Sequence, residues 1–97
     1  MKVLVLSSAE DDLRAGFEFY ERRQVGIGTY FLECISRDID ALEVEVGIHR
    51  TEDGYHRRLS DRFPFAIYYT VETDAVRVWR VLDLRRDPVW LRQELRK

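Results

Sequence analysis

The feature that most constrains the fold is an apolar run, Phe63–Val71, in which large side chains recur at every second position. Alternate side chains of a β-strand point to the same face, so this period of two predicts a strand with one face buried against helices. Pro64 has no N–H to donate to a neighbouring strand, so it is expected at the start of the strand or where the missing N–H does no harm. The side chains expected on the buried face are those of Phe63, Phe65, Ile67, Tyr69 and Val71.

The chain before this strand predicts a short strand and a helical hairpin. Residues 2–6 are apolar and form the short strand, and residues 7–23 repeat apolar side chains at helical spacing. A second helix is expected from Ile27 to Val46, after a break at 24–28 whose two glycines can adopt positive φ. The expected apolar stripes are Ala9, Leu13, Phe17 and Tyr20 on the first helix, and Ile27, Phe31, Ile35, Ile39, Leu42 and Val46 on the second.

The chain after the hairpin predicts two further strands, one on each side of the central strand in sequence. Residues 48–55 are expected to form a polar loop with a turn at Asp53-Gly54. A short strand is expected at 55–59 and a longer one at 75–84. Pro88 can start a short C-terminal helix, since proline fits the first helical turn. In the longer strand we expect Val76, Val78, Leu82 and Leu84 on one face, interrupted by Arg80, and Trp79 and Val81 on the other.

The resulting order of elements, β-α-α-β-β-β, predicts an α+β fold. A chain of 97 residues has the length of one domain, which we place at residues 1–97. Two helices joined by a few residues pack as an antiparallel hairpin. We expect this hairpin to cover one face of a mainly antiparallel, four-stranded sheet.

Charge is divided unevenly along the chain, whose net charge is −2. Residues 1–48 carry five basic and ten acidic side chains, whereas residues 49–97 carry eleven basic and eight acidic ones. A pI near 5.7 differs from the basic pI of a domain that nucleic acid holds by bulk charge. We therefore expect no high-affinity nucleic-acid binding. A local surface of arginines is still expected, because ten of the eleven basic residues in the second part are arginine.

Composition also argues against disulfide, metal and membrane chemistry. The single cysteine, Cys34, has no internal partner and is expected to be a buried apolar side chain. His49 and His56 lack further ligands at metal spacing, so neither a metal nor a cofactor is expected. No apolar run approaches the ~18 residues of a membrane span, and no cleavage-type segment follows the N-terminal strand. These features predict a cytoplasmic protein without a membrane partner.

The order of elements and several short motifs resemble the RelE/ParE family of toxins from bacterial type II toxin–antitoxin modules. No single motif is specific, because each is short, but together they cover nearly the whole chain in the family's order. The matching residues are Leu6-Ser7, Ala9 and Asp12-Leu13; Gly26-Ile27-Gly28 and Phe31; Gly54 and Arg57-Arg58-Leu59; Arg62-Phe63-Pro64-Phe65 and Ile67-Tyr68-Tyr69; and Arg85-Arg86-Asp87-Pro88 with Trp90.

This resemblance implies a plasmid-stabilisation toxin that inhibits growth and is neutralised by a cognate antitoxin. Family members share the fold but differ in target: one branch cleaves messenger RNA at the ribosome, another poisons DNA gyrase, and others have no known target. The ribosome and DNA gyrase are therefore the candidate targets. An antitoxin can add a strand to an exposed edge of the sheet and lay an amphipathic helix against the hairpin.

RNA cleavage without a metal needs a base for the 2′-hydroxyl, cations for the phosphate and an acid for the leaving oxygen. Arg58, Arg62 and Arg85 are the candidate catalytic residues of this alternative. The nuclease branch also relies on lysines in the middle strands and on a Tyr or His near the C-terminus. Here both lysines lie at the ends of the chain, and no Tyr or His follows Leu84. The sequence therefore favours a ParE-like toxin that binds its target without catalysis.

A toxin of this kind needs only a binding surface, and arginine and tryptophan are enriched at binding hot spots. The candidate target- or antitoxin-binding residues are Arg57, Arg58, Arg62, Arg85, Arg86 and Trp90. Arg57 and Arg58 are adjacent in a strand and point to opposite faces, so they cannot serve one surface. Two alternatives stay open: the arginines pair with surface carboxylates, at only ~0–1 kcal/mol each, or a degenerate toxin keeps antitoxin binding alone.

Overall fold

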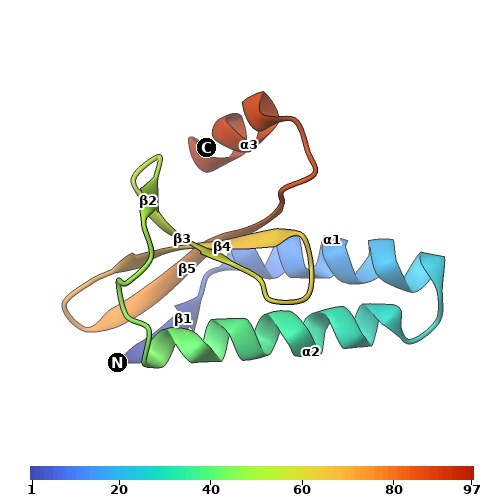
Figure 1. Cartoon of the computed structure of the whole chain (residues 1–97), viewed down its shortest axis with the longest axis horizontal. Helices are drawn as coiled ribbons and strands as arrows, with labels where there is room; N and C mark the ends of the chain where they lie inside the picture. Colours follow the sequence, from blue (N-terminus) through green and yellow to red (C-terminus); the bar gives the residue numbers. More distant parts are fainter.

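A five-stranded β-sheet forms the middle layer of the protein in the computed structural model, which describes residues 1–97 (Figure 1). Its strands are β1 (Lys2–Val5), β2 (Thr51–Glu52), β3 (Tyr55–Leu59), β4 (Phe65–Val71) and β5 (Ala75–Asp83). They lie side by side in the order β1-β5-β4-β3-β2. β1 runs parallel to β5, and every other neighbouring pair is antiparallel. The sheet is therefore mainly antiparallel, as the sequence predicts.

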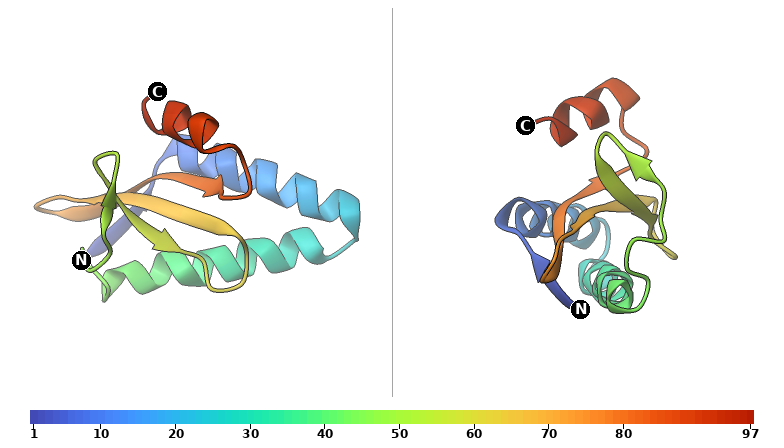
Figure 2. Two further views of the ribbon diagram at one scale, coloured as in Figure 1. Left: turned by 45° about the horizontal axis from the view of Figure 1, so that its top comes forward. Right: turned by 90° about the vertical axis from the view of Figure 1, so that its left-hand side faces the viewer.

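Helices cover both faces of this sheet. α1 (Ser7–Arg23) and α2 (Ile27–Asp40) form a hairpin on one face, and a turn of 3₁₀-helix, η1 (Ala41–Glu43), follows α2 directly. The short helix α3 (Pro88–Leu95) lies across the sheet from the hairpin (Figure 2). The side chain of Asp87 caps α3. None of these helices combines the length and the apolar composition that crossing a membrane requires.

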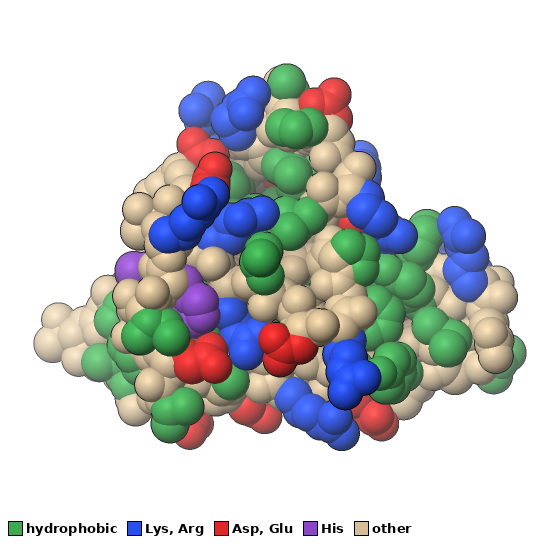
Figure 3. Space-filling view, in the orientation of Figure 1, with side chains coloured by type: hydrophobic (Ala, Val, Ile, Leu, Met, Phe, Trp, Pro, Cys, Tyr) green, Lys and Arg blue, Asp and Glu red, His purple; other side chains and the backbone are tan.

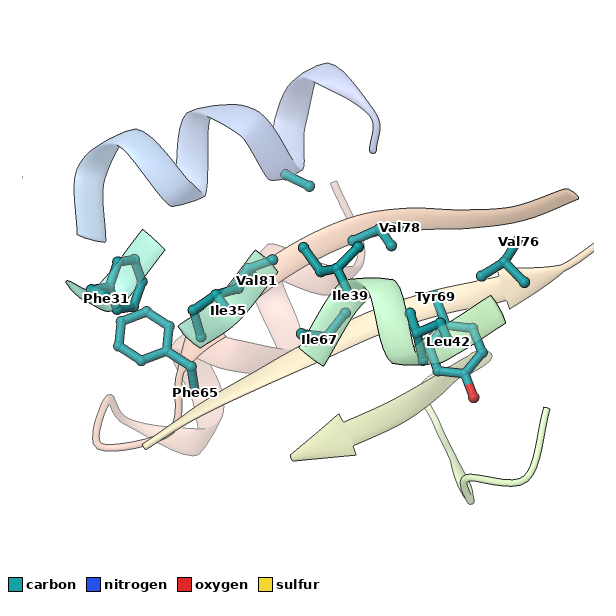
Figure 4. Packing of buried hydrophobic residues seen from close by; sticks show 11 residues of the cluster. Phe31, Ile35, Ile39, Leu42, Phe65, Ile67, Tyr69, Val76, Val78 and Val81 are labelled. Atoms are coloured by element: carbon teal, nitrogen blue, oxygen red, sulfur yellow. The ribbon is translucent and has the colours of Figure 1, made fainter. Parts of the chain in front are cut away.

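The larger hydrophobic core lies between the hairpin and the sheet (Figure 4). The β4 side chains that point into it are Phe65, Ile67 and Tyr69. Most of its other members come from α2, η1 and β5, namely Phe31, Ile35, Ile39, Leu42, Val76, Val78 and Val81. The period of two in β4 therefore selects the side chains that face the hairpin.

A smaller cluster lies on the opposite face of the sheet, beneath α3. Ala66 and Tyr68, the alternate residues of β4, pack there with Leu82 of β5 and Leu95 of α3. β4 is thus buried on both faces, which agrees with its nearly continuous apolar sequence.

The expected order of elements is confirmed, with local differences. The sheet has five strands rather than four, because Thr51–Glu52, in the expected polar loop, pairs with β3. The second helix ends at Asp40 rather than at Val46, and η1 tightens its last turn. Gly28 is helical, so Gly26 is the residue of this connection that adopts positive φ.

The predicted faces of β5 are wrong beyond Trp79. The pairing of β4 with β5 skips Trp79, which is therefore an extra residue in its strand. Such a β-bulge shifts the alternation of side chains by one position. Val81 consequently joins Val76 and Val78 on the hairpin side, where Leu82 was expected, and Leu82 faces α3 instead.

The hairpin is tightly closed where α2 begins. A Cβ at Gly28 would lie 2.7 Å from the carbonyl oxygen of Phe17 and 2.8 Å from Oε1 of Glu21. The Glu21 carboxylate also accepts hydrogen bonds from the N–H groups of Gly26 and Gly28, at 3.0 and 2.9 Å. Close approach of the two helices at this point therefore requires glycine at position 28.

We expect Gly28→Ala to lower the free energy of unfolding by about 1–3 kcal/mol, because the added methyl group forces the two helices apart. Urea unfolding measures this change. Thr29→Ala, at the exposed neighbouring position, is the matched control and should shift stability by about 0.5 kcal/mol or less. Equal stability of Gly28→Ala and the wild type would contradict the tight contact.

Candidate interaction surface

Two connections of the chain meet at one end of the sheet. The β3–β4 turn carries Arg62, and the β5–α3 connection carries Arg85 and Arg86. A backbone hydrogen bond joins the two connections, since the N–H of Leu84 donates to the carbonyl oxygen of Pro64 at 2.8 Å. We call this set, together with Trp90 of α3, the arginine end: Arg62, Arg85, Arg86 and Trp90.

Two guanidinium groups of the arginine end have no carboxylate partner. Arg62 is exposed and forms no ion pair. Arg86 lies over the ring of Trp90, 3.8 Å from its centroid, and also forms no ion pair. A cation–π contact at an exposed site contributes only about 0.5–1 kcal/mol and leaves the charge unneutralised. Both positive charges are therefore available to a partner.

Arg85 is held in place but stays accessible. Its guanidinium donates to Asp83 at 2.7 Å and to the Tyr20 hydroxyl at 3.2 Å, while 52% of the side chain is exposed. Burial alone would raise the pKa of Asp83, but hydrogen bonds from Arg85 outweigh that effect and lower it. The contact with Tyr20 joins residues far apart in sequence, and no pattern in the sequence indicates it.

Aromatic side chains border the arginine end on the helical hairpin. Phe19 and Tyr30 are 40% and 43% exposed, and their rings connect through Tyr20 and Phe63 at centroid distances of 5.0–5.7 Å. The guanidinium of Arg23 lies 4.6 Å from the Phe19 centroid. Hydrophobic side chains with basic ones among them gather over this end of the hairpin (Figure 3). Aromatic and arginine side chains in such proximity are the composition of protein-binding hot spots.

Arg57 and Arg58 lie outside the arginine end and point to opposite faces of the sheet, as their adjacency in β3 predicts. Arg57 lies beside Tyr68, is half-buried and forms no ion pair. Arg58 is 8% exposed and contacts Glu45 at 3.0 Å and Asp38 at 3.2 Å. This enclosure makes Arg58 part of the protein interior rather than of a contact surface.

A second enclosed arginine, Arg80, joins three elements. It contacts Asp12 of α1 at 2.8 Å and Glu94 of α3 at 3.0 Å. Hydrogen bonds with Asp12 raise the pKa of Arg80 in spite of its burial. In the sequence, Arg80 is seen only as an interruption of an apolar face. Its carboxylate partners, Asp12 and Glu94, lie on other elements, so the sequence does not indicate these contacts.

The two histidines lie in a separate cluster beside β3 and β4. Nδ1 of His49 is 2.5 Å from the Tyr69 hydroxyl, and its Nε2 is 3.5 Å from Oε1 of Glu45. Nδ1 of His56 is 2.6 Å from the carbonyl oxygen of His49, and its ring stacks on Tyr69. No three potential metal ligands gather here or elsewhere in the chain. The cluster fastens the segment after η1 to the sheet.

We expect stability to fall in mild acid because this cluster holds His49 neutral. Burial lowers the pKa of His49 from its ordinary value of 6.5, with Glu45 opposing the shift and Arg58 and His56 adding to it. The unfolded chain therefore binds the proton more readily, so the free energy of unfolding falls as the pH drops below 6.5. Urea unfolding between about pH 7.5 and 5.5, where histidine is the group that titrates, measures the slope.

The variant His49→Gln should flatten this pH dependence, since it removes the group that takes up the proton. His56 is present in both proteins, so the comparison isolates the effect of His49. The same slope in the variant and the wild type would contradict the assignment to His49.

Comparison with known proteins relates this chain to others through its fold. No protein-family model matches the chain, and no curated protein matches it. Among solved structures, a chain from the "Chromosomal ParDE TA system from P. aeruginosa" aligns with 87% of this chain and 96% of its own length. The TM-score is 0.79 and the sequence identity 18%. The expected α+β fold is therefore confirmed, and this chain has a ParE-like fold.

Proposed function

We propose that residues 1–97 form the toxin of a type II toxin–antitoxin module, a ParE-like toxin that acts in the cytoplasm. The observation that carries this proposal is the fold shared with a chain of the P. aeruginosa ParDE toxin–antitoxin system over most of both chains. The motifs distributed along the sequence in the order of the RelE/ParE family support the same assignment independently of the structure.

The toxin acts by binding its target through the arginine end. Arg62 and Arg86 offer positive charges without carboxylate partners, and Arg85 is positioned by Asp83 and Tyr20 while remaining half exposed. Desolvated contacts to arginine and tryptophan side chains carry much of the energy of typical protein interfaces. DNA gyrase is the target to be tested first, because the resemblance implies it for the non-nuclease branch.

The edges of the sheet support an antitoxin partner. β1 pairs with β5 alone, so its outer edge has no neighbouring strand. On the opposite edge, the short strand β2 pairs only with Tyr55 and His56 of β3, and the N–H of Arg57 donates to the carbonyl oxygen of Arg50. Unpaired edges of this kind can accept a strand from another chain. The antitoxin therefore adds a strand to one of these edges and covers it.

The experiment induces the chain alone in bacterial cells and follows messenger RNA and the DNA-damage response over the first minutes. The proposal predicts growth arrest with DNA-damage signalling and intact transcripts, and weaker arrest with Arg85→Ala. Arg37→Ala, which removes an exposed arginine of α2 that forms no ion pair, is the control and should arrest growth like the wild type. Transcript cleavage at codon boundaries would instead establish the nuclease alternative, and undisturbed growth would contradict a toxin.

A further inference from the structure

A groove of about 280 Å³ opens beside the arginine end, between α1, the end of β5 and α3. Ala15 and Gly16 of α1 form one part of its lining, together with Phe65 and Leu82 of the sheet. Phe19 and Trp90 line it from the two helices. Small-molecule sites usually measure about 300–1,000 Å³, so the groove is at the lower end of that range and has room for one large side chain.

The lining of this groove carries three carboxylates and two guanidinium groups, and they differ in whether they are already paired. The carboxylates in its lining already have cationic partners: Arg80 holds Asp12 and Glu94, and Arg85 holds Asp83. By contrast, the guanidinium of Arg86 forms no ion pair and lies over the ring of Trp90.

Arg23 adds a second free cation near the groove, because it meets only the ring of Phe19. An incoming carboxylate therefore finds unpaired guanidinium groups at the groove, whereas an incoming cation finds every lining carboxylate engaged. Charge complementarity selects an acidic partner.

We propose that this groove is a socket for a single aromatic or leucine side chain, presented by an acidic segment of the protein that the chain targets. The anchor side chain packs between Phe19 and Trp90, and carboxylates next to it in the segment pair with Arg86 and Arg23. The assignment of this segment to the cellular target rests on the proposed function. The size of the socket and the charges around it do not depend on that function.

The binding test uses a synthetic peptide in which one phenylalanine is flanked by glutamates, beside the same peptide with alanine at that position. Titration into the isotope-labelled protein should shift the NMR signals of Phe19 and of the Trp90 indole. The alanine peptide should bind roughly tenfold or more weakly, as expected for loss of an anchor. Shifts confined to other surfaces, or equal binding of both peptides, would overturn the socket.

Ala15→Phe tests the groove by filling it from the exposed face of α1. This variant should lose peptide binding, whereas Ser36→Phe, at an exposed small residue of α2, should retain it. Thermal unfolding of both variants controls for folding. Full peptide binding by a folded Ala15→Phe variant would overturn the proposal.

Growth assays connect the socket to the cellular target. A toxic wild type with a non-toxic but folded Ala15→Phe supports the socket. A wild type and an Ala15→Phe variant that are equally toxic would overturn the socket and leave the toxin assignment standing. A wild type that does not inhibit growth contradicts the toxin assignment, and the peptide titration then decides on the socket alone. Occupation of the groove by a second copy of the chain, seen as dimers that Ala15→Phe abolishes, would also overturn it.

Discussion

Replacing Arg58 by alanine is expected to lower the free energy of unfolding by about 3–5 kcal/mol, the usual cost of removing one partner from a buried ion pair. Arg58 and Asp38 are 8% and 4% exposed, and their side chains lie 3.2 Å apart. The variant leaves the carboxylate of Asp38 buried without its cation, and it also frees Glu45. The network joins β3 to the end of the hairpin, so its loss weakens the contact between the two layers.

Urea unfolding of Arg58→Ala, compared with Arg57→Ala, measures this effect. Arg57 is the adjacent residue of β3, forms no ion pair and is more exposed, so its removal should change stability by about 0.5 kcal/mol or less. Arg58→Lys should fall between the two, because a lysine keeps the charge but cannot contact several carboxylates through a planar fork. Similar losses in Arg57→Ala and Arg58→Ala would show that the buried network contributes little.

Phe31→Ala is expected to cost about 3–5 kcal/mol, as for other buried phenylalanines. Phe31 is fully buried, and its ring lies 4.9–5.2 Å, between centroids, from those of Tyr20, Phe63 and Phe65. It also fills the space above Gly16, where a Cβ would lie 2.6 Å from the ring. Truncation therefore leaves a cavity that joins α1, α2 and the sheet.

Urea unfolding of Phe31→Ala should show a lower free energy of unfolding. The dependence of that free energy on urea concentration should change little, since the fold itself persists. Tyr30→Ala removes the aromatic neighbour that is 43% exposed, and it should cost much less. If Tyr30→Ala proved as destabilising as Phe31→Ala, the packing shown for the hairpin would be wrong.

The elements of this fold could be predicted because their signals are local. The period of two in β4 and the apolar stripe of the second helix indicate which face of each element is buried, and Phe31, Ile35 and Ile67 lie in the core accordingly. The β-bulge at Trp79 could not be predicted, because an extra residue in β5 has meaning only against the register of β4. One unforeseen residue thus reversed the faces of Val81 and Leu82.

The candidate site could be predicted only in part, for a similar reason. Because Arg57 and Arg58 are adjacent in one strand, the sequence predicts that they point to opposite faces of the sheet. Because Arg85 and Arg86 directly follow a strand, it also predicts that they lie at an end of the sheet. The enclosure of Arg58 depends on carboxylates that other elements supply, which the sequence does not pair. The convergence of Arg62 with Arg85 depends on β4 lying beside β5, which is a property of the strand order.

If the arginine end confers toxicity, removing its arginines should abolish growth arrest in cells that express the chain without an antitoxin. The comparison is between the wild type, a variant with alanine at Arg62, Arg85 and Arg86, and a charge-matched control with alanine at the exposed Arg37, Arg92 and Arg96. Circular dichroism establishes that all three proteins fold.

We expect the wild type and the control to arrest growth and the arginine-end variant not to, since each hot-spot side chain is worth about 2 kcal/mol or more of binding. Arrest by the arginine-end variant as complete as that by the wild type would contradict a toxic role of the arginine end, and so would normal growth of cells that express the wild type.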